Sequence, residues 1–234
     1  MGIDLEIFLE KNVNHKTFIN KKSAFYSCRA EKKVPALFLD RDGVVIHDCN
    51  YIKSPKDVKI FDGASSLISF FKSIGWRVII VSNQSGIFRG FFKWADYERV
   101  NHRMLELLDL QLNIDAIYAN GNGPSCDQNN WRKPNPNMLI EASNDFNINL
   151  EDSILIGDRI TDLIAGNKAG IKLLIHVLTG HGINERDQVI KLSENLLKKN
   201  SNLSKEYQNC NSKKGIILIE NLLEFDYRDY IFYN

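Results

Sequence analysis

Two aspartates one residue apart follow an apolar run near the start of the chain. Asp40 and Asp42 come directly after Val34–Leu39, and Gly43 follows them. If a strand ends there and turns at Gly43, both carboxylates can converge on one point beyond the sheet edge. Carboxylates held that close repel each other unless a proton or cation lies between them, and Mg²⁺ is a suitable cation. Asp40 could then act as a nucleophile and Asp42 as an acid or base, although the same residues also suit an ordinary turn.

Three further polar clusters follow later apolar runs. One contains hydroxyl and amide donors suited to phosphate oxygens. Its residues are Ser82, Asn83, Gln84 and Ser85. In the next, Arg132 and Lys133 precede Pro134, which fixes the loop backbone, so that their charges could face a phosphoryl group. In the last, Asp158 follows the run Ser153–Ile156 and could complete a metal shell.

The elements that must position these residues are short buried strands. Six apolar runs without alternation indicate strands covered on both faces. They are Val34–Leu39, Arg77–Val81, Ile114–Tyr118, Ser153–Ile156, Lys172–Val177 and Gly215–Ile219. Helical spacing of apolar residues predicts helices between them. These are Ala64–Ile74, Trp94–Leu108, one capped by Asn135 that runs to Phe146, and one capped by Asp158 or Thr161 that runs to Ala169. The alternation predicts a doubly wound α/β fold with a mostly parallel sheet, which binds ligands outside the carboxyl ends of its strands.

Two regions stand outside this alternation. Residues 1–33 form an N-terminal extension, in which Leu5–Leu9 could form an extra helix or the segment could mediate self-association. Residues 34–234 form the α/β domain, with an insertion near 189–214 whose Lys, Asn and Ser content is typical of a surface segment.

Composition narrows the possible partners and compartment. Thirty Lys and Arg against 29 Asp and Glu give a net charge of +1, so no general basic field exists to attract nucleic acid or an anionic membrane. No apolar stretch approaches the roughly 18 residues of a membrane helix. The four cysteines are far apart and form no CxxC pair, which indicates reduced thiols and a cytoplasmic location.

The four polar clusters, in order over about residues 34–180, resemble the motifs of the haloacid dehalogenase (HAD) superfamily of phosphatases. The stretches Phe38–Gly43, Asn83–Gly90, Arg132–Leu139 and Gly157–Asp162 are most similar to the histidinol-phosphatase-like branch, in particular to its heptose bisphosphate phosphatases. The resemblance implies a Rossmann-like HAD core with a minimal cap domain or none. It also implies Mg²⁺-dependent hydrolysis of D-glycero-D-manno-heptose 1,7-bisphosphate to the 1-phosphate through an aspartyl-phosphate.

The resemblance further implies roles for individual residues. Asp40 would be the nucleophile and Asp42 the general acid and base, while Ser82 and Lys133 would steady the phosphoryl group. Mg²⁺ would be held by Asp40, by the backbone carbonyl of Asp42 and by Asp158. The residues implied in substrate binding are Asp48, Cys49, Asn50, Tyr51, Asn83, Gln84, Ser85, Arg132 and Arg159.

One departure from the branch concerns zinc. Many members bind zinc through three Cys and one His just before the Arg-Lys pair, whereas Ala119–Trp131 here contains Cys126 and no other such ligand. A closed zinc site needs four ligands, so we expect magnesium and no zinc.

Several alternatives remain open at this point. The substrate could be histidinol phosphate or another small phosphate ester rather than a heptose bisphosphate. A non-catalytic protein that binds a phosphorylated ligand is a further possibility, although such a protein has no need for both Asp40 and Asp42. Arg89, Arg132 and Arg159 could hold a second phosphate, which would favour a bisphosphate. The sequence leaves the oligomeric state open.

Overall fold

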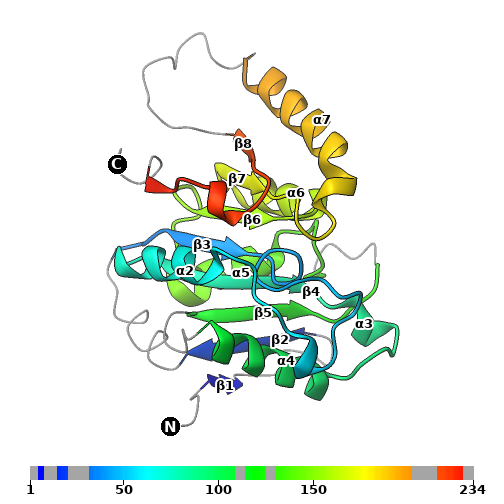
Figure 1. Cartoon of the computed structure of the whole chain (residues 1–234). Coiled ribbons are helices and arrows are strands. Elements are labelled where there is room, and N and C mark those ends of the chain that lie inside the picture. The colour runs from blue at the N-terminus through cyan, green and yellow to red at the C-terminus, as the bar shows by residue number, and fades with distance from the viewer. Residues whose placement is uncertain are drawn as a thin grey trace.

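An eight-stranded sheet forms the centre of the protein in the computed structural model, which describes residues 5–7, 15–20, 32–108, 114–124, 130–201 and 215–228 (Figure 1). The strands are β1 (Leu5–Ile7), β2 (His15–Asn20), β3 (Ala36–Leu39), β4 (Arg77–Asn83), β5 (Ala116–Asn120), β6 (Ile154–Gly157), β7 (Leu173–His176) and β8 (Gly215–Leu218). Their order across the sheet is β1-β2-β5-β4-β3-β6-β7-β8, and all neighbours from β5 to β8 are parallel. The predicted mostly parallel α/β fold is confirmed.

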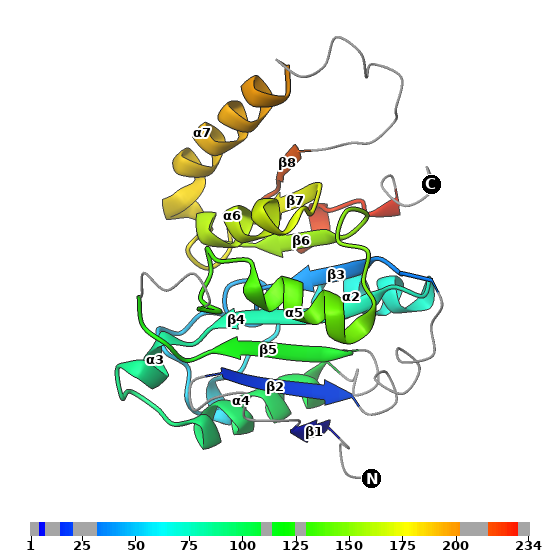
Figure 2. The ribbon, with the colours of Figure 1, turned by 180° about the vertical axis from the view of Figure 1, so that it is seen from behind.

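Helices cover both faces of this sheet (Figures 1 and 2). On one face lie α2 (Ala64–Ser73) and α4 (Trp94–Leu107); on the other lie α5 (Asn137–Phe146), α6 (Ile160–Ala169) and the start of α7 (Gly182–Ser201). The shorter helices are η1 (Pro55–Asp57), α3 (Ser85–Phe88) and η2 (Leu222–Glu224). In β3, Leu37 and Leu39 enter one core while Phe38 enters the other, and all three are buried. This burial on both faces explains the apolar runs without alternation.

The N-terminal strands were not predicted. β2 pairs antiparallel with β5, and β1 pairs antiparallel with β2. The helix expected around Leu5–Leu9 is therefore wrong for the described residues Leu5–Ile7, which form β1. The described pieces Leu5–Ile7 and His15–Asn20 extend the sheet of the α/β domain beyond β5.

Three boundaries differ from the sequence expectations. α7 continues to Ser201, so the first part of the expected insertion near 189–214 is helical, and Val189 of this helix is buried in the core. α5 starts after Pro136 rather than after Asn135. α6 starts at Ile160, and its first turn is closed by Asp162, whose carboxylate accepts the Arg159 N–H at 3.0 Å. None of the helices in the described ranges has the length and hydropathy of a membrane span.

The carboxyl ends of β3, β4 and β6 lie together. Leu39 at the end of β3 is in register with Ile80 of β4 and Ile156 of β6. From β3 the chain proceeds to β4 and β5 on one side, and later to β6 and β7 on the other, so the strand order reverses at β3. Such a reversal opens a crevice at the carboxyl ends. The described segment between β3 and α2 contains only η1, so this part of the chain carries no separately folded cap.

Candidate active site

A cavity of about 250 Å³ lies at these strand ends. Most of the residues predicted for the site line it. They are Asp40, Asp42, Asp48, Asn50, Tyr51, Ser82, Asn83, Gln84, Ser85, Lys133 and Arg159. Residues that were not predicted line it too. They are Arg41, Ile52, Gly86, Thr161, Asp162 and His181, whereas the lining residue Arg89 was a candidate for binding a second phosphate.

Three predicted residues lie beside or behind the cavity. Cys49 is an exposed thiol next to the lining residues Asp48 and Asn50. Arg132 is half-buried, and its Nη1 donates to the Asn122 carbonyl at 3.4 Å. Asp158 is fully buried.

Two glycine loops enclose Asp158. Gly43 follows β3 with a φ of 93°, and Gly180 follows β7 with a φ of 58°. A Cβ added at either position would lie within 2.4 Å of Asp158 Oδ2. Thr179 Oγ1 donates to the Gly43 carbonyl at 2.5 Å and ties the two loops together. Only glycine fits at these two positions, because the backbone must approach the carboxylate closely.

Asp158 belongs to a buried carboxylate cluster. One carboxylate oxygen from each of Asp40, Asp158 and Asp162 lies within 4.8 Å of the other two. Burial raises the pKa of Asp40 to about 7, against the lowering effect of Lys133. Burial, with added repulsion from Asp40 and Asp162, raises the pKa of Asp158 to about 9. The cluster is therefore short of positive charge.

One oxygen of this cluster lacks a partner. Asp158 Oδ2 accepts the His181 N–H at 2.7 Å, whereas the buried Asp158 Oδ1 accepts no hydrogen bond from the described residues. A buried carboxylate oxygen without a donor is costly unless a cation binds it. Hard divalent cations such as Mg²⁺ prefer carboxylate oxygens, so the donor set fits that ion.

Lys133 bridges two members of the cluster. Its Nζ lies 2.7 Å from Asp40 Oδ1 and 2.7 Å from Asp162 Oδ1, and it donates to the Val81 carbonyl at 2.9 Å. Burial acts to lower the pKa of Lys133, but the charges of Asp162 and Asp40 outweigh it and raise the pKa. The residue therefore stays charged at the entrance to the cluster.

The backbone of Lys133 is held by Asn83 at the end of β4. Asn83 Oδ1 accepts the Lys133 N–H at 3.0 Å, and Asn83 Nδ2 donates to the Lys133 carbonyl at 3.1 Å. This reciprocal pair fixes the loop before α5 against the sheet. Asn83, assigned to substrate binding by the resemblance, thus also positions the Lys133 loop.

The Asp42 carboxylate lies apart from the cluster. It forms an ion pair with the buried Arg41 at 3.0 Å and accepts a hydrogen bond from Gln84 Nε2 at 2.7 Å. Its charge is thus balanced by a guanidinium, an ion pair that the spacing of the two aspartates did not predict. Asp162 takes the place of Asp42 beside Asp40. Its position inside the Gly157–Asp162 motif was the signal available in the sequence.

The rim of the cavity combines a histidine–aspartate contact with aromatic and cationic side chains. His181 Nε2 lies 2.9 Å from Asp48 Oδ2. Tyr51 contacts Phe91 edge to face, and the Arg89 guanidinium lies 5.9 Å from the Tyr51 ring centroid. The sequence offered no strong signal for His181, because its partner Asp48 is far away along the chain.

Two arginines of the cavity lining, Arg89 and Arg159, act on the half-buried Arg132 beside them. Burial, followed by the positive charges of Arg159 and Arg89, lowers the pKa of Arg132. Arg159 has a distant carboxylate partner, Glu185 Oε1 at 3.7 Å. Neighbouring cations that repel one another favour an anion between them.

Comparison with known sequences finds a matching family model and several similar phosphatases. A family model described as HAD-hydrolase-like matches residues 130–196. A D-glycero-beta-D-manno-heptose-1,7-bisphosphate 7-phosphatase of Helicobacter pylori (strain ATCC 700392 / 26695) is 36% identical over 139 residues, which cover 58% of this chain and 80% of the relative. A D-glycero-alpha-D-manno-heptose-1,7-bisphosphate 7-phosphatase of Campylobacter jejuni is 38% identical over 146 residues, 62% of this chain and 83% of the relative.

A solved structure agrees with these relatives. The D,D-heptose 1,7-bisphosphate phosphatase of B. bronchiseptica, complexed with magnesium and phosphate, superposes with a TM-score of 0.62 at 27% identity, covering 81% of this chain and 94% of that one. The identity and coverage of the sequence relatives, together with this fold, identify the family. The chain belongs to the HAD-like hydrolases, in the family of D-glycero-D-manno-heptose-1,7-bisphosphate 7-phosphatases.

Proposed function

We propose that this chain is a Mg²⁺-dependent phosphatase that removes the 7-phosphate of D-glycero-D-manno-heptose 1,7-bisphosphate and leaves the 1-phosphate. One observation carries the proposal. The Asp40 carboxylate, 7% exposed at the cavity wall, lies among two further carboxylates and 2.7 Å from the Lys133 ammonium. This combines a nucleophile, a set of cation ligands and a phosphate-binding charge at one point.

The reaction proceeds in two steps. An Asp40 oxygen attacks phosphorus, the bond from phosphorus to the sugar oxygen breaks, and the proton of Asp42 passes to that oxygen. Asp42 then takes a proton from water, which attacks the aspartyl-phosphate and releases inorganic phosphate. Mg²⁺, when bound by Asp40, Asp158 and the Asp42 carbonyl, neutralises charge on the phosphoryl oxygens.

The remaining groups bind and orient the substrate. Lys133 and Ser82 hold the phosphoryl oxygens, and Lys133 also lowers the repulsion between the phosphate and Asp40. Phosphate monoesters hydrolyse very slowly without a catalyst, so positioning and charge neutralisation must supply most of the rate enhancement.

The arginines support a bisphosphate substrate. Arg89 and Arg159 line the cavity, and both lie close enough to the neighbouring Arg132 for their charges to act on it. Planar guanidinium groups suit the second phosphate of the sugar. The names of the relatives point to the same substrate, in both its alpha and beta forms.

Two expectations extend the proposal. Cys126, the residue on which the zinc prediction depended, lies outside the described residues, so a zinc-free enzyme stays a prediction that metal analysis of the purified protein can test. The location in the cytoplasm also stays a prediction, based on the unpaired cysteines of the sequence.

The experiment is a substrate panel with Mg²⁺. It compares both anomers of heptose 1,7-bisphosphate, heptose 1-phosphate and histidinol phosphate, each with and without a chelator, and repeats the assay with Asp40→Asn. We expect chelator-sensitive phosphate release that is fastest with a heptose bisphosphate and absent in the variant. A preference for histidinol phosphate would contradict the substrate, and an active Asp40→Asn enzyme would contradict the mechanism.

A further inference from the structure

A buried arginine separates the two aspartates of the reaction. Arg41 has no exposed surface. Its Nε and Nη2 donate to both carboxylate oxygens of Asp42, at 3.2 and 3.0 Å. The Asp42 side chain, 21% exposed, lines the cavity. A bidentate pair of this kind fixes the orientation of a carboxylate as well as its charge.

The other side of the guanidinium is fixed by helix α4. Arg41 Nη1 donates to Asn101 Oδ1 at 2.8 Å, and the guanidinium carbon lies 4.5 Å from the centroid of the Tyr97 ring. Tyr97 and Asn101 are one turn apart on α4, and both are buried. Charge, hydrogen bonding and ring stacking thus hold the arginine in one place away from water.

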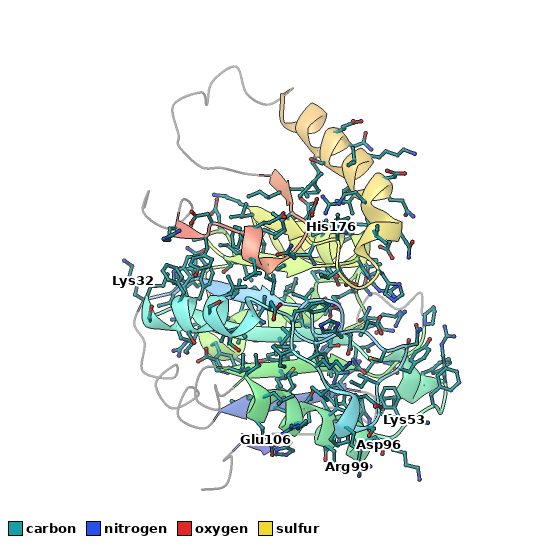
Figure 3. The ribbon with its side chains drawn as sticks, viewed as in Figure 1. Lys32, Lys53, Asp96, Arg99, Glu106 and His176 are labelled. Atoms are coloured by element: carbon teal, nitrogen blue, oxygen red, sulfur yellow. The ribbon has the colours of Figure 1, made fainter. Side chains whose placement is uncertain are left out.

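Tyr97 and Asn101 differ from the other residues of α4. Its outer side carries charged residues, marked in Figure 3 by Asp96, Arg99 and Glu106. Its inner side is otherwise apolar, with Val100 and Met104 in the core. Asn101 is a buried polar residue of this helix, and its side-chain oxygen accepts a hydrogen bond from the arginine beside the site.

A second element holds Asp42 from the opposite side. Gln84, directly after β4, donates from Nε2 to Asp42 Oδ2 at 2.7 Å and to Ser82 Oγ at 2.7 Å. The Asp42 carboxylate is therefore fixed between β4 and α4 while its neighbour Asp40 belongs to the cation cluster.

We propose that Arg41, anchored on α4 by Asn101 and Tyr97, is a positioning residue that aims the Asp42 carboxyl group at the leaving-group oxygen. The inference rests on the proposed function, because it requires Asp42 to transfer that proton. As the phosphorus–oxygen bond breaks and the proton leaves Asp42, the carboxylate that forms faces the guanidinium. Without Arg41, Asp42 keeps a single hydrogen bond from Gln84, which no longer fixes the orientation of the carboxyl group, whereas Asp40 keeps its own contact with Lys133.

The dependence of the reaction rate on the leaving group distinguishes a positioning role of Arg41 from a merely structural one. A sugar alkoxide departs slowly unless it is protonated, whereas p-nitrophenolate and acetate depart without a proton. If Asp42 is misdirected, only the reaction with the sugar phosphate therefore becomes slower. If the substitution instead disturbs the hydrophobic core, the reactions with all substrates become slower by a similar factor. The quantity to compare is kcat/KM, which covers the steps up to departure of the leaving group and excludes the later hydrolysis of the aspartyl-phosphate.

The experiment measures kcat/KM with Mg²⁺ for heptose 1,7-bisphosphate, p-nitrophenyl phosphate and acetyl phosphate. The test variants are Arg41→Lys, which keeps the charge but loses the bidentate geometry, and Asn101→Ala, which removes the anchor without touching Asp42. Asp42→Asn provides the pattern for complete loss of the acid. His102→Ala, an exposed change on the same helix next to Asn101, is the matched control.

We expect Arg41→Lys to lower kcat/KM about 100-fold for heptose bisphosphate, within the usual contribution of general acid catalysis, and by less than about threefold for the other two esters. Asn101→Ala should show the same selectivity with a smaller loss, and His102→Ala should match the wild type. If Arg41→Lys does not fold, Asn101→Ala decides the question.

Equal losses on all substrates, or no loss, would overturn the positioning role while leaving the proposed function intact. A wild-type enzyme that releases phosphate from none of the three would overturn the proposed function itself, and the inference with it.

Discussion

At the scale of single residues, the site depends on how a few buried charges are divided. Asp40, Asp158 and Asp162 form one group with Lys133, and Asp42 forms another with Arg41. The first group is suited to bind a cation and a phosphoryl oxygen, and the second to move a proton. Keeping the groups separate allows two aspartates only one residue apart to perform different chemistry.

Lys133 contacts the cation cluster through Asp40 and Asp162, and Asp162 gives the first prediction. Asp162→Asn keeps the size of the side chain but removes one of the two carboxylates beside Lys133. We expect the Mg²⁺ concentration for half-maximal rate to rise about 10- to 100-fold, as for other residues that orient metal ligands. Titration of the phosphatase rate with Mg²⁺ measures this change. Asp187→Asn, an exposed change of equal charge on α7, should leave the midpoint unaltered, and an unchanged midpoint in Asp162→Asn would refute the assignment.

At the scale of elements, the strands near the site could be predicted from the sequence because each apolar run ends in polar residues of the site. The runs ending at Leu39, Val81 and Ile156 became β3, β4 and β6, and the polar residues after them meet in one cavity. Parallel strands bring their carboxyl ends to one edge, so this convergence could be read from the order of motifs alone.

The features that the sequence did not predict, such as β2 and the burial of Arg41, have no apolar periodicity that would reveal them. β2 contains a single fully apolar pair, Phe18 and Ile19, and its stability comes from pairing with β5, which local sequence does not reveal. Arg41 is charged and follows a strand, so its type suggested exposure, whereas Tyr97 and Asn101 from α4 bury it. The His181 and Asp48 pair was hidden for a similar reason, since its members are distant in sequence.

The two glycine loops give a prediction at this scale. Gly180→Ala places a methyl group against the Asp158 carboxylate, which must move, so we expect loss of Mg²⁺-dependent activity by at least about tenfold in addition to a strain cost of roughly 1–2 kcal/mol. Gly75→Ala is the control, because Gly75 also has positive φ but nothing lies within 4 Å of the added Cβ. Thermal unfolding and Mg²⁺ titration of both variants separate strain from the metal effect. Equal activity in the two variants would show that the loop does not shape the metal site.

At the scale of the whole molecule, the buried carboxylates that would bind Mg²⁺ make the metal-free fold less stable as pH rises. The folded pKa values of Asp40 and Asp158, about 7 and about 9, lie above their ordinary value of 3.8. Between the ordinary and the raised values, the folded metal-free chain binds more protons than the unfolded chain. The free energy of unfolding contributed by these groups therefore falls as pH rises through this window.

Mg²⁺ should reverse that loss, because it binds the deprotonated carboxylates. At about 100 times its dissociation constant it would stabilise the protein by about 2.7 kcal/mol. We expect the rise in Tm on adding Mg²⁺ to be larger at about pH 8 than at about pH 5.5, where protons occupy the cluster. Differential scanning calorimetry with Mg²⁺ or with a chelator measures both increments. The same increment at both pH values, or a full response in Asp158→Asn, would argue against the cluster as the metal site.

The central claim is that Asp40 becomes phosphorylated. The most direct measurement is rapid acid quenching of the Asp42→Asn enzyme with acetyl phosphate and Mg²⁺, because acetate departs without a proton from Asp42, followed by mass spectrometry of its peptides. In this variant the base for the second step is absent, so the intermediate should accumulate. We expect one phosphoryl group, attached to Asp40 and absent from an Asp40→Asn enzyme. A phosphoryl group on another residue, or turnover by wild-type enzyme with no phosphorylated Asp40 in either form, would contradict it.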